Sequence, residues 1–285
     1  KRMADSRQLS PELLDLLAAL ATACGGLPRA AALEFAEAER RALRRTNGGD
    51  PAQLVDALHL ALPTADGAIA PILPDLIGEA VLLRVLDRPE NRPGATAALE
   101  RAWAQAGPQV AVTLIRTVQD FAAEGVGCYG ERHLPALAWL ERLAGSEART
   151  AVDLMALADS MPAETVVLRE LAEKLTKEAL ACLPAGDERS TAERARLTSN
   201  SAVRLSELGQ REAALAAAQE AVALLKPFFL RLPAAYAQWM AVMLGGLFKH
   251  LEACGRQPDP AELQPILDAL EPFQSPPPAK PGAPS

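Results

Sequence analysis

The chain has 285 residues, 49% of them hydrophobic and only 4% aromatic, and it carries a formal charge of −7 at pH 7. This length and apolar content are enough for one or two buried cores, while the negative charge disfavours general binding to nucleic acid or anionic lipid. The four widely separated cysteines fit neither a disulfide-dense secreted scaffold nor a zinc module.

Alanine and leucine dominate the composition and β-branched runs are scarce, so we expect an all-α fold with little or no β structure. Ser10 and Pro11 are typical of the start of a helix, and Gly25-Gly26 of its end. Two further helices are expected after Pro28 and after Asp50. Three helices therefore precede the first break in the pattern.

The segment 63–74 breaks the helical pattern, because Asp66-Gly67 indicates a turn and the apolar pieces on either side of Pro71 are short enough for a hairpin. Three short helices, such a hairpin and a following helix are the order of a winged-helix-like module. We place this module at residues 1–88.

Two prolines, a glycine and four charges fall within residues 87–94, which indicates a domain border. Beyond it, helices punctuated by Gly, Pro or Asp predict helical hairpins without strands, arranged as a short tetratricopeptide-like α-solenoid at 95–272. The expected helices lie near 95–106, 108–124, 131–144, 147–159, 162–182, 188–208, 211–231, 234–254 and 260–271. Residues 273–285 read as a disordered, proline-rich tail.

The stretch RLSELGQREAALAAAQEAVALL, residues 204–225, is the best candidate for a single repeat. Counted from Ala202, the W, L-G, A, F and P positions of the 34-residue tetratricopeptide pattern are occupied by Leu205, Leu208-Gly209, Ala221, Leu225 and Pro233. Gly209 and Ala221 are expected to let two helices approach closely, although Glu212 replaces the tyrosine of the pattern. An ordinary amphipathic helical hairpin is the alternative.

A groove along the first helix of this repeat is the expected place for a protein or peptide partner. The residues expected to face that groove are Asn200, Val203, Arg204, Ser206 and Gln210.

Three stretches together resemble the C-terminal regions of bacterial STAND-type signalling ATPases: residues 13–39, 70–86 and 196–225, about a quarter of the chain. The resemblance implies an NTPase core followed by a winged-helix-like segment and tetratricopeptide repeats that sense or recruit a partner. No G-x-x-x-x-G-K-[ST] loop occurs in this chain. We therefore expect either an ATPase domain elsewhere in the same polypeptide or a protein that keeps only the regulatory part.

No residues predict catalysis, a metal site or a cofactor. His59, His133 and His250 each stand alone, without a second ligand at metal-binding spacing. Cys128 and His133, in CYGERH, are the nearest pair to a nucleophile and its base, but no orienting acid accompanies them. A helical enzyme built on this pair is the alternative to a non-enzymatic interaction region.

A basic patch lies on the second helix of the winged-helix-like module and raises the alternative of a DNA-binding regulator. It consists of Arg40, Arg41, Arg44 and Arg45. Because Glu34, Glu37 and Glu39 share this helix, we expect a surface or interdomain contact and no nucleic-acid partner.

The chain contains no run of about 18 apolar residues, and its first residues lack the apolar core of a secretory signal. We therefore expect a cytoplasmic protein without a membrane contact. The first residue, Lys1, is not methionine, which is consistent with a piece of a longer polypeptide.

Overall fold

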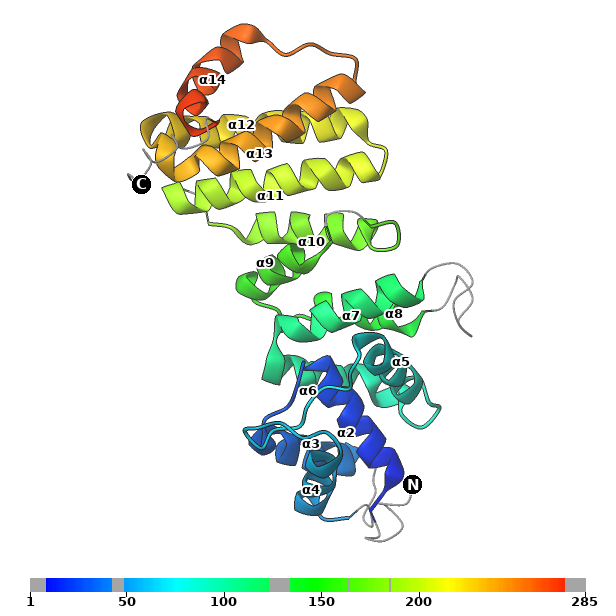
Figure 1. The fold of residues 1–285 in the computed structure, drawn as a ribbon. Helices are drawn as coiled ribbons and strands as arrows, with labels where there is room; N and C mark the ends of the chain where they lie inside the picture. Colours follow the sequence, from blue (N-terminus) through cyan, green and yellow to red (C-terminus); the bar gives the residue numbers. More distant parts are fainter. Residues whose placement is uncertain (1–8, 43–48, 123–133, 163–164, 185, 275–285) are drawn as a thin grey trace, which may run out of the picture. The chain divides into compact units, whose positions relative to one another are not determined.

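The computed structural model describes residues 9–42, 49–122, 134–162, 165–184 and 186–274 (Figure 1). These residues form thirteen α-helices, one 3-10 helix and no strand, which confirms the all-α prediction. Contacts group the chain into two compact units, Lys1–Pro162 and Ala163–Ser285. Each unit is described by itself.

Most helices of the first unit begin and end close to the predicted positions, although the last of them, α9, begins at Ala151 and not near residue 147 as predicted. The helices are α2 (Pro11–Ala23), α3 (Arg29–Ala42), α4 (Pro51–Ala61), α5 (Asp75–Leu86), the 3-10 helix η1 (Arg92–Gly94), α6 (Ala95–Ala106), α7 (Pro108–Phe121), α8 (Pro135–Ala144) and α9 (Ala151–Ser160). At the start of α2, the Ser10 hydroxyl accepts a hydrogen bond of 3.3 Å from the Leu13 amide. Gly25, with φ +69°, follows the end of α2 in a conformation that favours glycine.

Helix α2 lies at the centre of the first unit and packs against α3, α4, α5, α6 and α7. Its leucines Leu13, Leu16, Leu17 and Leu20 are buried. Residues 87–94, where the sequence indicated a domain border, lie inside this unit, because α2 contacts helices on both sides of them.

The segment between α4 and α5 bridges to itself across the turn at Asp66-Gly67 and also to the loop between α2 and α3. Ile69 forms isolated antiparallel bridges with Leu27 and with Pro63, and the backbone amides and carbonyls of Leu27 and Ile69 exchange hydrogen bonds of 2.9 and 2.8 Å. The predicted turn at Asp66-Gly67 is present, with the bridge between Pro63 and Ile69 across it, but none of the bridges joins the two sides of Pro71. The fully buried Ile69 side chain instead anchors this segment against the loop between α2 and α3.

Helix α5 approaches its neighbours closely at Gly78. A Cβ atom at this position would lie 2.5 Å from the Ile72 carbonyl oxygen and 2.8 Å from the Thr22 side chain. Glycine is therefore required where α5 meets the end of α2.

The second unit is a sequence of antiparallel helices, each packed against the next (Figure 1). They are α10 (Arg169–Cys182), α11 (Glu188–Glu207), α12 (Arg211–Arg231), α13 (Pro233–Ala253) and α14 (Pro260–Gln274). Because α11 also touches α13, and α12 touches α14, the helices form two layers. Alternation of this kind is typical of helical-repeat proteins.

The helix boundaries do not follow the 34-residue tetratricopeptide register. Since α11 begins at Glu188 and α13 begins at Pro233, one helix pair spans 45 residues. Gly209 lies in the turn between α11 and α12 with φ +76°, and a Cβ there would meet nothing within 4 Å. Its predicted role as a close helix contact is therefore wrong: Gly209 ends α11 as a left-handed cap. Ala221 is fully buried in α12.

Helix α12 is the one helix in the described part of the chain that is long and apolar enough to cross a membrane by length and composition. It packs between α11 and α13, with Leu215, Leu225 and Phe229 buried in the core of the unit. This packing accounts for its apolar composition.

At the C-terminal end, α14 continues to Gln274, two residues beyond the predicted end of the helical region. Residues 275–285, which make up most of the predicted tail, lie outside the described part of the chain.

Replacing Gly78 by alanine tests the close approach of α5. We expect Gly78→Ala to lower the free energy of unfolding by about 1–3 kcal/mol, since the new methyl group overlaps a backbone carbonyl. Gly245→Ala is the matched control, because a Cβ in the middle of α13 meets nothing within 4 Å and should raise stability by about 0.5–1 kcal/mol. Chemical denaturation measures both changes, and a neutral Gly78→Ala would contradict the packing.

Candidate functional site

The predicted groove residues of α11 fall into two groups. Val203 is 39% exposed and Gln210 is exposed, while Asn200 and Ser206 are half-buried. Asn200 and Val203 are three residues apart and therefore share the outer side of the helix. These four positions are available to a partner.

Arg204 is the exception, because only 5% of it is exposed. Its guanidinium lies 3.6 Å from the Glu207 carboxylate, and Glu207 in turn accepts a hydrogen bond from the Thr165 amide. Its prediction as a surface contact is therefore wrong: Arg204 is buried beside Glu207, and Glu207 connects α11 to the segment before α10.

Helix α13 contacts α11 and has an exposed side of its own. That side presents Val242, which is 68% exposed, and Phe248, which is 38% exposed, together with the exposed Ala241 and Gly245. No charged residue occurs in the sequence from Pro233 to Phe248. We use the name α11/α13 face for the half-buried Asn200 together with the exposed residues Val203, Gln238, Ala241, Val242, Gly245 and Phe248.

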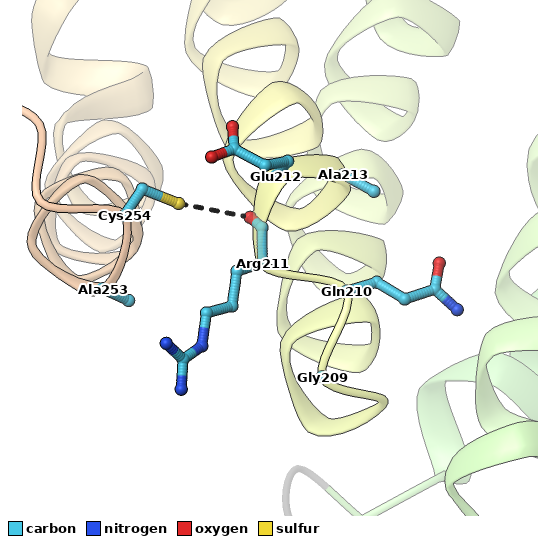
Figure 2. A pocket seen from close by; sticks show the side chains of 7 residues that line it. All are labelled: Gly209, Gln210, Arg211, Glu212, Ala213, Ala253 and Cys254. Carbon is cyan, nitrogen blue, oxygen red and sulfur yellow. Dashed lines mark hydrogen bonds between the residues drawn. The ribbon is translucent and has the colours of Figure 1, made fainter.

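A hollow of about 590 Å³ lies where the α11–α12 turn meets the end of α13 (Figure 2). It is lined by Gly209, Gln210, Arg211, Glu212, Ala213, Ala253 and Cys254. Figure 2 shows Cys254 pointing toward the Arg211 carbonyl, to which its thiol donates over 3.6 Å. The hollow is open and partly polar, and Figure 2 shows the Gln210 side chain pointing away from Ala253 and Cys254.

The basic patch is only partly described. Arg40 and Arg41 both pair with Glu37 at 2.9 Å, so their charges are partly neutralised within α3. Arg44 and Arg45 lie outside the described residues.

An ion pair that was not predicted from the sequence joins the same helix, α3, to α6. Glu39 is buried, and its Oε1 accepts a hydrogen bond of 2.7 Å from Arg101 Nε on α6. Burial raises the pKa of the Glu39 carboxyl, while the hydrogen bond and charge of Arg101 oppose that rise. No local signal separated Glu39 from its exposed neighbours, because its burial depends on the position of α6.

The residues with catalytic potential do not gather into a site in the described part of the chain. His59 Nδ1 lies 2.9 Å from the Ala68 carbonyl, and His250 is buried in α13, where burial and the charge of Lys249 lower its pKa. Cys128 and His133 lie outside the described residues. Nowhere in the described ranges do three His, Cys, Asp or Glu side chains form a group that could hold a metal ion.

Comparison of the chain with protein-family models, curated proteins and solved structures gave no significant match.

The thiols differ enough to be tested by alkylation. Burial raises the pKa of the Cys24 thiol to about 12, whereas Cys182 is exposed at the end of α10. We expect a maleimide at pH 7 to label Cys182 in the folded protein and to label Cys24 more than about tenfold more slowly. Peptide mapping by mass spectrometry measures both rates, with the unfolded chain as control. Equal rates in the folded protein would contradict the burial of Cys24.

Proposed function

We propose that this chain is a non-catalytic interaction and regulatory region whose second unit binds a protein through the α11/α13 face. One observation carries the proposal: the outer side of α13 is exposed yet uncharged from Pro233 to Phe248. Soluble proteins rarely leave such a surface open to water without a partner for it. The face offers apolar contact through Val203, Val242 and Phe248.

The polar groups beside this surface indicate the form of the partner. Asn200 lies along α11, and Gln210 lines the hollow at its end. A partner helix or extended segment would place apolar side chains against α13 and hydrogen-bonding groups along α11. The two-layer helix order of the unit supports a helical-repeat architecture for this task.

The first unit supports a winged-helix-like module in the same region. Its order is helix, bridge residue Leu27, two helices, bridge residue Pro63, a turn and bridge residue Ile69. In DNA-binding modules of this kind the third helix enters the major groove. Here that helix is α4, which contains no arginine or lysine and exposes Asp56 and Leu60.

We therefore assign the first unit a protein contact within a cytoplasmic signalling protein. The resemblance to STAND-type ATPases supports an NTPase domain, in the same polypeptide or in a separate protein, as the partner of this unit. The coding sequence upstream of Lys1 tests this directly, since a phosphate-binding loop there would support the proposal.

If a partner binds through the α11/α13 face, substitutions on that face should weaken the binding, and substitutions elsewhere on the second unit should not. We expect Val242→Glu, and separately Val203→Glu, to weaken partner binding at least about tenfold, because each places a charge in an apolar contact. Ala216→Glu, on the exposed side of α12, is the matched control and should bind normally. The partner is identified by cross-linking in the source cell and its affinity is measured by calorimetry.

Circular dichroism must show that all three variants keep their helices. An unchanged affinity of Val242→Glu, or an equal loss in Ala216→Glu, would overturn the assignment of the surface. A hydrolase activity of the purified chain would overturn the non-catalytic part of the proposal.

Nucleic-acid binding is tested separately. We expect duplex DNA to show no saturable binding at 50 mM salt, because Arg40 and Arg41 pair with Glu37 and Arg29 pairs with Asp56, which leaves little positive field on α3 and α4. Fluorescence anisotropy at two salt concentrations measures it. Salt-sensitive binding that is lost in Arg40→Ala/Arg41→Ala would favour the DNA-binding alternative instead.

A further inference from the structure

Helix α5 carries a carboxyl group in the interior of the first unit. Glu79 is only 1% exposed, and α5 packs against α2 on one side and α7 on the other. Neither carboxyl oxygen is reached by solvent or accepts a hydrogen bond. An ionised carboxylate in such a place loses its hydration without replacement.

The groups that face Glu79 do not supply that replacement. Arg116 Nε on α7 lies 3.2 Å from Glu79 Oε1 but makes no hydrogen bond with it, and Arg116 Nη1 lies 2.6 Å from Asp75 Oδ2. Asp120, one turn further along α7, lies beside the Glu79 carboxyl. Three carboxyl groups therefore share one guanidinium.

Helix α2 adds no charge to this cluster. The contact of Gly78 with Thr22 places the C-terminal end of α2 next to the start of α5, whereas Asp15 near the other end of α2 pairs with Arg88 at 2.7 Å. The Cys24 thiol, just beyond the end of α2, faces the Ala102 carbonyl on α6.

One proton on Glu79 removes the repulsion between the Glu79 and Asp120 carboxylates. If Glu79 is protonated, its O–H can donate to Asp120, and Arg116 remains paired with Asp75. If both carboxyls are ionised, two negative charges face each other, and the ion pair with Arg116, which Asp75 shares, offsets this repulsion only in part. Burial, followed by the hydrogen bond and the charge of Asp120, raises the pKa of Glu79 to about 7, against the opposing charge of Arg116.

We propose that Glu79 and Asp120 form a proton-dependent latch that holds α5 against α7, closed while the two carboxyls share a proton and weakened when both are ionised. The latch lies next to the close approach at Gly78, so its release loosens the first turns of α5. These turns carry the exposed Leu76 and Ile77, and the latch therefore couples an exposed apolar segment to pH.

The sign of the effect follows from linkage. Because the pKa of Glu79 is higher in the folded chain than the ordinary value of 4.5, the folded state binds the proton more tightly. The stabilisation is complete below about pH 4.5 and is lost as the pH rises through about 7. The latch thus opens on the alkaline side of neutrality.

Hydrogen exchange of α5 amides, corrected for the intrinsic pH dependence of exchange, tests the latch in the whole chain. We expect protection of α5 to fall about tenfold between pH 6 and pH 8 in the original sequence. Glu79→Gln should remove this pH dependence, because its amide donates to Asp120 at every pH. Glu34→Gln, at an exposed position on α3, is the matched control and should keep it.

A second variant distinguishes an effect of charge on the latch from a change in the packing of α5. Asp120→Asn changes an exposed residue, removes the opposing charge and should shift the transition in α5 protection to lower pH. A ¹³C titration of the Glu79 carboxyl, assigned with Glu79→Gln, should show a midpoint near pH 7. A midpoint below pH 5, or a tenfold change that persists in Glu79→Gln, would overturn the proposal.

Discussion

Close packing between alanine- and leucine-rich helix faces is the interaction on which both units depend. Large rings fill little of the core, since aromatic residues make up 4% of the sequence. Helices must therefore approach one another until small side chains interlock. Positions such as Ala221 in α12 and Gly78 in α5 exist to permit that approach. The same closeness leaves no space for water around a polar side chain that the packing traps.

Local signals predicted most of the helices, because caps and breakers act within a few residues, but the starts of α9 and α10 were placed too early. Ser10, Pro11 and Gly25 begin and end α2 as their chemistry dictates, and the predicted helix at 211–231 matches α12. The 34-residue register failed for a related reason. A Leu-Gly pair such as 208–209 also commonly ends a helix. In the folded chain Gly209 ends α11 and makes no close contact between helices.

Contacts between residues that lie far apart in the sequence could not be predicted from it. The bridge between Leu27 and Ile69, the Glu39–Arg101 pair and the carboxyl cluster around Glu79 each join segments that only the packing of α2 brings together. Burial decides which of many similar glutamates becomes unusual, and no local pattern encodes it. Of the candidate site, the exposed positions of α11 followed from helical periodicity, while the contribution of α13 required the folded arrangement.

The uncharged outer side of α13 has a consequence for how the protein behaves in concentrated solution. Like-charge repulsion between molecules keeps most proteins apart, and this chain carries a net charge of −7 to supply it. None of that charge lies on α13 between Pro233 and Phe248. Two molecules that meet through these surfaces face little like-charge repulsion there. The protein is therefore expected to self-associate through this side of α13 as its concentration rises.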